Sequence, residues 1–283
     1  MNFDFNEEQT MIMDGIARYI REEYDFDRRR SIIESDSAYS DDVWRQFSEL
    51  GWLSIPFDES YGGFGGHADD LAGVMLELGK GLIIEPYMST VVVFGSLLNA
   101  SNNDSLKEQL IPRIINGQYK GSFAYAEEQS RFEISDVKTS AQKCGDGYKL
   151  NGTKIAVIDA KESDGLIVTA RTGGSQYGAE GISLFLVDTS AEGVAVSSYN
   201  TMDSHSSSTI NLENVFVTEA NLIVHEGEGF RHIESCLPQI LLCLSAEALG
   251  IMEVLNKLTV EYSKTRKQFG APIGSFQALQ HRM

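Results

Sequence analysis

Basic residues are scarce in this sequence. Its 283 residues include 23 lysines and arginines but 41 aspartates and glutamates, which gives a formal net charge of −18 at pH 7. A surface of this sign repels nucleic acid and anionic membranes, so neither is expected as a partner. An anionic small molecule remains compatible with the composition, because its site can be basic locally.

Cysteine is also scarce, and Cys144, Cys236 and Cys243 are scattered along the chain. They show neither the spacing of metal ligands nor the pattern of a disulfide framework. We therefore expect no bound metal and a protein of a reduced compartment, the cytoplasm.

A long, purely apolar segment is missing as well. Residues 1–8 are acidic and contain no apolar stretch, so they do not match a secretory signal peptide. The longest apolar run, residues 237–252, contains Pro238, Gln239 and Glu247. Because this run is too short and too polar for a membrane span, we interpret it as a buried helix.

The spacing of apolar residues predicts helices over most of residues 1–116. Asn6, Ser40 and Asp104 are each placed to cap one of these helices, and Gly117 ends the last. One predicted helix carries an apolar stripe formed by Trp44, Phe47 and Leu50.

A strand pattern replaces the helical one after Gly117. Four short segments are rich in β-branched or aromatic residues, namely 122–126, 148–150, 166–170 and 182–187. The dipeptide Asn151-Gly152 and the tripeptide Gly145-Asp146-Gly147 each predict a turn. The helical period returns after Gly229 and runs to Lys267.

Helices, then strands, then helices predict an α+β fold. We expect an N-terminal all-α domain over residues 1–116 and a central β-domain, in the form of a barrel, over residues 117–222. A partial C-terminal helical domain is expected over 223–283.

The most specific motif lies at the end of the sequence. Residues 265–281 read T-R-K-Q-F-G-x-P-I-x-x-F-Q-x-x-x-H, which strongly resembles the signature R-x-Q-F-G-x-P-I-x-x-F-Q of the acyl-CoA dehydrogenases. In that family the segment joins two long helices of a C-terminal four-helix bundle. Met283 falls where the second helix begins, so the resemblance implies a chain that is C-terminally incomplete.

Weaker matches occur in the family's order along the rest of the chain. They are F-x-x-E-Q at 5–9, L-G-W-L-x-I-P from Leu50, D-V-K-T-x-A at 136–141, N-G-x-K at 151–154 and L-E-N-V-x-V at 212–217. The resemblance therefore covers the whole chain and implies the three-part fold of that family.

The resemblance also implies an activity. Its members use FAD to oxidise an acyl-CoA thioester to a trans-2-enoyl-CoA, and an electron-transfer flavoprotein-like acceptor then reoxidises the flavin. Two alternatives stay open: a non-catalytic subunit of a heteromeric acyl-CoA dehydrogenase, or a related flavin oxidase or monooxygenase on the same fold.

The terminal signature implies four FAD-binding residues. Arg266 would pair with the pyrophosphate of an FAD in a neighbouring subunit, because a guanidinium matches phosphate oxygens and keeps its charge. Gln268 would add an amide donor, Phe269 an apolar wall, and Gln277 a contact near the adenosine. The alternative for Arg266 is a solvated arginine at a helix C-terminus, where the dipole favours cations.

The first flavin strand departs from the family pattern Y-x-x-T-E-P-x-A-G-S-D. Ala126 replaces the Thr, and Arg131-Phe132 replaces the Gly-Ser pair. Tyr125 and Ala126 remain FAD-binding candidates, because backbone contacts do not depend on side chains. Arg131 and Phe132 are candidates for substrate binding, Arg131 as a cation near phosphates; the alternative is a surface arginine at a β-bulge.

The second flavin strand departs from N-G-x-K-x-W-I-T. Ala156 replaces the Trp of this pattern, and Ile158 replaces its Thr. The missing ring and hydroxyl predict weak or absent flavin in the isolated chain.

These departures resemble a subgroup, the small subunits of pimeloyl-CoA dehydrogenases. The resemblance rests on A-E-x-Q-x-R-F-x-I-x-D-V at 126–137 and on residues 246–253. It implies fatty acid metabolism and an oligomer, either a homo-oligomer or a heteromer with a larger homologous subunit.

No catalytic base can be assigned. The family's usual Glu lies near the end of the bundle, beyond Met283, and in one branch the base occupies a position that is Ile240 here. Glu247, two helical turns further along, is a weak candidate. The Glu127-Glu128 pair is interpreted as a solvated turn or a flavin contact. We expect no appreciable turnover from the 283-residue chain alone.

The last predicted helix carries an apolar face that favours association. Its members are Leu241, Leu244, Ala248, Ile251 and Leu255. Large exposed apolar patches promote contacts between proteins, so a dimer or a larger species is expected.

Overall fold

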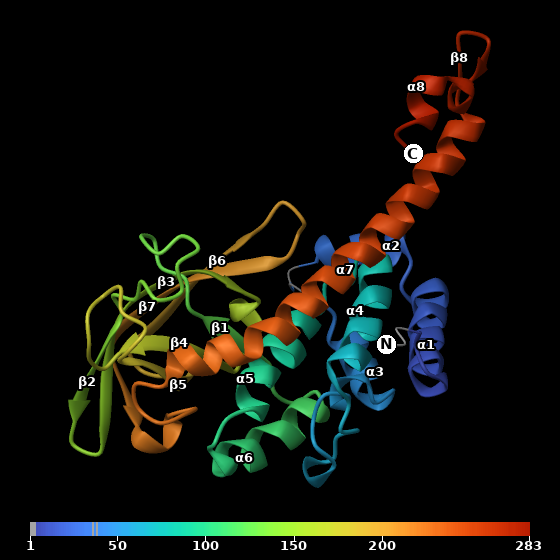
Figure 1. Cartoon of the computed structure of the whole chain (residues 1–283). Coiled ribbons are helices and arrows are strands. Elements are labelled where there is room, and N and C mark those ends of the chain that lie inside the picture. The colour runs from blue at the N-terminus through green and yellow to red at the C-terminus, as the bar shows by residue number, and fades with distance from the viewer. Residues whose placement is uncertain (1–3, 36, 38) are drawn as a thin grey trace. The chain divides into compact units, whose positions relative to one another are not determined.

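The computed structural model describes residues 4–35, 37 and 39–283 of the chain (Figure 1). Residues 1–3, at the start of the acidic segment 1–8, lie outside the described residues. The chain forms two compact units. The first comprises the segment that ends at Arg29 together with Ala72–Ile83 and Cys243–Met283, and the second comprises Arg30–Leu71 and Ile84–Leu242.

The helices and strands follow the expected order. The α-helices are α1 (Glu7–Glu23), α2 (Phe26–Ile33), α3 (Asp41–Glu49), α4 (Ala68–Lys80), α5 (Gly95–Asn99), α6 (Asp104–Ile115), α7 (Gly229–Thr265) and α8 (Gln277–Gln280). The strands are β1 (Gly121–Ala124), β2 (Ser140–Cys144), β3 (Gly147–Ile158), β4 (Gly165–Arg171), β5 (Ile182–Asp188), β6 (Val194–Asn200), β7 (Ser206–Thr218), β8 (Lys267–Gln268) and β9 (Ala271–Pro272). A buried π-helix, η3 (Tyr87–Phe94), precedes α5.

Two of the three predicted helix caps are confirmed. The Asn6 side chain accepts a hydrogen bond from the Gln9 N–H, and the Gln9 side chain accepts one from the Asn6 N–H, both at 2.9 Å. This reciprocal pair is a capping box that satisfies two donors at the start of α1. Ser40 caps α3 by accepting from the Val43 N–H at 3.4 Å.

The prediction that Asp104 caps a helix is wrong. Asn103 caps α6 by accepting from the Leu106 N–H at 3.1 Å. Asp104 is the first helical residue, and its carboxylate instead pairs with Lys107 Nζ at 2.7 Å.

The apolar stripe of α3 is shorter than predicted. Trp44 and Phe47 are buried, whereas Leu50 is 52% exposed. The helix has already ended at Leu50, and the chain turns at Gly51 with a φ of 77°, which glycine adopts without steric cost.

In the first unit, two glycines bring α4 and α7 into backbone contact. A Cβ at Gly79 would lie 2.3 Å from the Glu247 carbonyl oxygen, and one at Gly250 would lie 2.0 Å from the Leu76 carbonyl oxygen. The ammonium of Lys80 adds a polar contact between the two helices at 3.2 Å from Glu253.

In the second unit, the expected β-domain is one curled seven-stranded sheet (Figure 1). Its strand order is β1-β4-β2-β3-β7-β6, with β5 paired to β4. The pairs β1–β4 and β2–β4 are parallel and the remaining pairs antiparallel. A buried cluster that includes Tyr148, Leu150 and Phe185 forms the core of this sheet.

One of the two predicted turns is confirmed. Gly145-Asp146-Gly147 lies at the hairpin between β2 and β3. The prediction for Asn151-Gly152 is wrong, because both residues lie inside β3 at a register irregularity opposite β7. Glycine is needed there since a Cβ would lie 2.4 Å from Thr139 Oγ1, so the dipeptide serves a bulge.

The prediction that residues 237–252 form a buried helix is also wrong. The run belongs to the 37-residue helix α7, and only 22% of its most apolar window is buried. Among the described residues, α7 is the one helix long and apolar enough to cross a membrane. That finding is weak evidence for a span, because the core helices of soluble proteins have the same length and composition.

Candidate functional site

A buried ion pair lies at the centre of the candidate site. Lys154 on β3 and Glu127, which follows β1, have side chains that are 0% and 4% exposed, and Lys154 Nζ lies 2.7 Å from Glu127 Oε1. The interpretation of Glu127 as part of a solvated turn is therefore wrong, although Glu128 is exposed. The alternative, a flavin contact, stays a prediction. Buried charges of this kind occur where they are paired and hydrogen-bonded.

Both oxygens of the Glu127 carboxylate accept hydrogen bonds. Besides Lys154, it accepts hydrogen bonds from the Lys138 N–H at 2.8 Å, the Thr139 N–H at 3.0 Å and the Gln129 side chain at 2.9 Å. The carboxylate therefore fixes both ends of the loop formed by residues 127–139.

Lys154 in turn fixes the strand that leads into this loop. Its ammonium donates to Thr169 Oγ1 at 2.7 Å and to the Tyr125 carbonyl at 3.4 Å. The next residue, Ile155, donates its N–H to the Ala126 carbonyl at 2.9 Å. The backbone of Tyr125 and Ala126 is thus held by β3.

The environment keeps both members of the pair charged at neutral pH. Burial alone would raise the pKa of Glu127, but the charge and hydrogen bond of Lys154, with the bonds from Gln129 and Thr139, lower it to about 2. Burial lowers the pKa of Lys154 to about 8, against the opposing effect of Glu127. The pair is consequently a structural anchor and not a proton carrier near neutral pH.

Next to this anchor lies an open face formed by the two predicted flavin strands. Tyr125 is 39% exposed and Ile158 is 43% exposed. Ala156 is also exposed and adopts a φ of 52° at the irregularity of β3. Tyr125 and Ala126 thus lie beside β3, which also carries Ala156 and Ile158. Flavin contacts of these residues stay a prediction.

The loop 127–139 presents both predicted substrate-binding residues to the surface. Arg131 is exposed with a φ of 47°, and Phe132 is fully exposed. Arg131 lies in a turn of this loop, so the alternative of a β-bulge arginine is not what the structure shows.

Arg171, at the end of β4, fixes the far part of this loop, and the sequence analysis missed it. Its guanidinium donates to the carbonyls of Ser135 at 2.9 Å and Val137 at 3.1 Å. It also donates to the carbonyls of Gln176 at 2.8 Å and Glu180 at 2.9 Å in the next loop. The sequence feature that could have indicated its role is an arginine at the end of the largely apolar run of β4.

The terminal signature forms a hairpin after α7. Strands β8 and β9 pair antiparallel, and Phe269 and Gly270 between them have φ values of 53° and 81°. Two successive positive φ values are the mark of a type I′ turn, which explains the glycine. The backbone of Arg266 is held by Tyr262 and Ile273, each at 2.8 Å.

The hairpin and the residues directly after it expose the four FAD-binding residues that were predicted from the terminal signature. Arg266, Gln268 and Gln277 are exposed, and Phe269 is 93% exposed. Within the described chain, no hydrogen bond or ion pair involves the side chains of Arg266, Gln268 or Gln277. These four residues belong to the first unit, whereas Tyr125, Ala126, Arg131 and Phe132 belong to the second.

The helix α7 carries the two positions considered for a base. Ile240 is buried, at 8% exposed, and Glu247 is half-buried. Burial, and then the charge of Glu247, raise the pKa of Cys243 to about 12, so this thiol stays protonated.

Comparisons with known proteins agree with this arrangement. Three models of one family match consecutive parts of the chain. The acyl-CoA dehydrogenase N-terminal domain matches residues 6–118, the middle domain 122–215 and the C-terminal domain 227–283.

Individual relatives span nearly the whole chain. The "Probable acyl-CoA dehydrogenase YngJ" of Bacillus subtilis (strain 168) is 31% identical and aligns with 100% of this chain and 75% of its own length. The FAD complex of PigA has a TM-score of 0.91 at 26% identity, covering 100% of this chain and 75% of that one. The ChsE4-ChsE5 complex from Mycobacterium tuberculosis has a TM-score of 0.89 at 26% identity, covering 100% and 73%.

The fold and the site together define a flavoprotein oxidoreductase. The chain belongs to the acyl-CoA dehydrogenase family. Its cofactor is accordingly FAD, which the similar PigA structure contains.

Proposed function

We propose that this chain takes part in the FAD-dependent oxidation of an acyl-CoA thioester to a trans-2-enoyl-CoA. One observation carries the proposal: the Glu127–Lys154 pair fixes the Tyr125–Ala126 backbone beside an open face. In this family, that face receives the flavin. The domain boundaries 1–116, 117–222 and 223–283 remain part of the proposal.

The exposed donors fit the charge of FAD. Arg266 offers a guanidinium and Gln268 and Gln277 offer amides, all on the segment around one hairpin, as an anionic pyrophosphate requires. Phe269 offers an apolar surface beside them. When bound, FAD supplies the acceptor for the hydride that leaves the β-carbon of the substrate.

For the substrate, we propose that Arg131 and Phe132 contact the CoA thioester. The guanidinium of Arg131 offers a planar fork of N–H donors, which matches the oxygens of a phosphate group. Phe132 is apolar and fully exposed in the loop that Glu127 and Arg171 hold in place.

Removal of the α-proton needs a base, and Glu247 is our candidate within these 283 residues. It is half-buried on α7, two helical turns beyond Ile240. If turnover is seen in spite of our expectation below, the Glu247→Gln variant tests the role. Retained flavin with lost turnover supports it, whereas unchanged turnover excludes Glu247.

A specific observation favours a second candidate, a non-catalytic subunit of a heteromeric dehydrogenase. The open face carries Ala156 and Ile158 where the family has a Trp and a Thr, so it offers one ring and one hydroxyl fewer. We propose that a larger homologous subunit compensates, as in the pimeloyl-CoA dehydrogenase type of fatty acid metabolism. The similar ChsE4-ChsE5 structure is itself a complex of two proteins.

We propose further that an electron-transfer flavoprotein-like protein accepts the electrons and that the location is cytoplasmic. The three cysteines are free thiols, as in a reduced compartment.

The experiment is anaerobic spectroscopy on the protein supplied with FAD, alone and after co-purification with a homologous subunit. We expect weak flavin retention and no appreciable turnover in the isolated chain. In the complex, acyl-CoA thioesters of increasing chain length should bleach the flavin absorbance and yield the enoyl product. An FAD-loaded complex that dithionite bleaches but no acyl-CoA bleaches would contradict the proposed function.

A further inference from the structure

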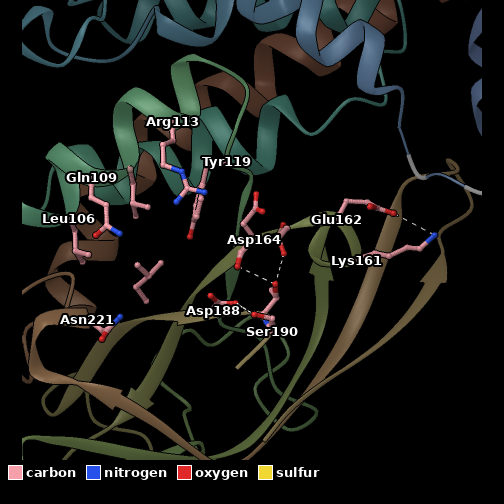
Figure 2. Close-up of a pocket in the computed structure, with 14 residues that line it drawn as sticks. Leu106, Gln109, Arg113, Tyr119, Lys161, Glu162, Asp164, Asp188, Ser190 and Asn221 are labelled. Carbon is pink, nitrogen blue, oxygen red and sulfur yellow. Dashed lines mark hydrogen bonds and ion pairs between the residues drawn. The ribbon is translucent and has the colours of Figure 1, made fainter. Parts of the chain in front are cut away.

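A polar pocket of about 530 Å³ lies on the second unit, lined by α6 and by residues at the ends of β4 and β5 (Figure 2). Its volume is typical of small-molecule sites, which measure roughly 300–1,000 Å³. None of the residues assigned above to FAD or acyl-CoA lines it.

A tyrosine hydroxyl without a hydrogen-bond partner among the described residues lies at this pocket. Tyr119 is only 6% exposed, and its hydroxyl makes no hydrogen bond with any described residue. Figure 2 shows this hydroxyl directed into the cavity. Its position is fixed, because the hydroxyl packs on Gly165, where a Cβ would lie 1.9 Å from it. Because the hydroxyl oxygen reaches the cavity, it is available to donate a hydrogen bond to, or accept one from, a ligand there.

Three carboxylates line the pocket: Glu162, which pairs with Lys161 at 3.6 Å, and Asp164 and Asp188. Asp164 accepts the Lys120 N–H at 2.8 Å through one oxygen, and Asp188 accepts the N–H and hydroxyl of Ser190 at 2.8 and 2.6 Å through one oxygen. Neither Asp164 nor Asp188 has an ion pair in the described part of the chain. After burial, the charges of Asp164 and then of Asp188 raise the pKa of Tyr119, while Arg113 opposes them.

Hydrogen-bond donors also line the pocket. The Arg113 guanidinium lies 4.9 Å above the centre of the Tyr119 ring and forms no ion pair in the described part of the chain. The Asn221 oxygen accepts from Thr218, which leaves its amide nitrogen available. Gln109 makes no hydrogen bond with any described side chain. In Figure 2, Gln109 and Asn221 lie across the cavity from Asp164.

We propose that this pocket binds a small zwitterion of the amino-acid class. Its ammonium group would lie near Asp164, Asp188 and the Tyr119 hydroxyl. Its carboxylate would take the donors of Arg113, Gln109 and Asn221. The inference goes beyond the proposed function and does not depend on it, because no residue is shared between the two sites.

Isothermal titration calorimetry on the full chain tests the proposal. The probes are glycine, β-alanine, γ-aminobutyrate and ε-aminocaproate, which separate the two charges by increasing lengths. Methylammonium and acetate each carry one of the two charges. We expect saturable binding of at least one zwitterion, with both single-charge probes at least about tenfold weaker, since each lost charged contact is worth that much. Equal binding of methylammonium, or no zwitterion binding at millimolar concentration, overturns the proposal.

Three variants connect the binding to the named groups. Tyr119→Phe keeps the ring under Arg113 and removes only the hydroxyl, so affinity should fall about three- to tenfold. Arg113→Gln and Asp188→Asn should each weaken binding about tenfold or more. Arg45→Gln, on the exposed face of α3, is the matched control and should leave affinity unchanged. With circular dichroism unchanged, wild-type affinity in Tyr119→Phe and Arg113→Gln overturns the assignment.

Discussion

Lys154 shows how one side chain can connect stability to the cofactor face. Each buried charge costs several kcal/mol of lost hydration, and only good geometry offsets this cost. Here Glu127 has four donors and Lys154 three acceptors, so both charges are satisfied. Removing one partner leaves the other buried without compensation.

Lys154→Met should therefore reduce the free energy of unfolding by about 3–5 kcal/mol, the usual cost of breaking a buried pair. Urea unfolding at neutral pH measures it. The control is Lys143→Met, whose partner Glu219 is exposed; it should change stability by less than about 1 kcal/mol. A loss at Lys154 no larger than at Lys143 would show that the pair is not an anchor.

Asp159, directly after β3, is a buried carboxylate that lowers the stability of the folded state when it is charged. It is 9% exposed and accepts a hydrogen bond from Ser89 at 2.6 Å. Burial raises its pKa to about 6, and the hydrogen bond from Ser89 and the charge of His205 oppose the rise only in part. Because the folded pKa lies above the unfolded one, the folded state holds a proton that the unfolded state loses between about pH 4 and 6. The free energy of unfolding therefore falls as pH rises through that window.

Asp159→Asn should remove this dependence. Near neutral pH, the variant should be more stable than the wild type by on the order of 1–3 kcal/mol, and near pH 4 the gain should vanish. Asparagine also tolerates the left-handed φ of 56° at this position. The measurement is urea unfolding of both proteins across this pH range. A stability difference that does not change with pH would refute the assignment of the shift to Asp159.

Single positions also show the limit of prediction from sequence. The motifs placed Glu127 and Lys154 in the two flavin strands. The two residues are 27 positions apart in the sequence, and no local pattern indicates that they form an ion pair. The pairing arises where the end of β1 meets β3. Arg171 escaped notice for the same reason, since its partners lie in two separate loops.

Helix ends were easier to predict than strands. A cap acts within four residues, so Asn6 and Ser40 could be identified from local sequence. Strands β2, β6 and β7 did not emerge from periodicity, because apolar alternation is weak in them. Strand β6 is almost entirely exposed, and β7 places three consecutive serines, 206–208, in buried positions.

The contact between α4 and α7 gives a prediction for these two helices. Gly250→Ala places a methyl group about 2.0 Å from the Leu76 carbonyl oxygen, so the helices must separate. We expect a loss of about 1–3 kcal/mol or more in the free energy of unfolding.

Gly15→Ala in α1 is the matched control, since nothing lies within 4 Å of the added Cβ. Alanine there should instead raise stability by about 0.5–1 kcal/mol, through helix propensity. Equal effects at both positions in thermal unfolding would disprove the close contact.

For the assembled protein, the open apolar face of α7 is the feature that matters most. Of the five predicted members of the apolar face, Leu241, Leu244 and Leu255 are 54%, 44% and 57% exposed and Ala248 is exposed, whereas Ile251 is half-buried. Leu258 adds a further leucine that is 60% exposed. Single exposed leucines are ordinary on protein surfaces, whereas a continuous row along one helix favours a partner. A strongly acidic chain resists non-specific association, so contact should concentrate on this row.

We therefore predict a dimer or larger species at micromolar concentration, or a heteromer when a homologous subunit is present. Light scattering with size-exclusion chromatography measures the mass. The double variant Leu255→Glu with Leu258→Glu should shift the protein toward the monomer without changing its circular dichroism, because both side chains are exposed and glutamate is a good helix former. Tyr177→Glu, 70% exposed in a loop of the second unit, is the control and should keep the wild-type mass. A wild-type monomer at these concentrations, or a double variant that associates as well as the wild type, would place subunit contact elsewhere.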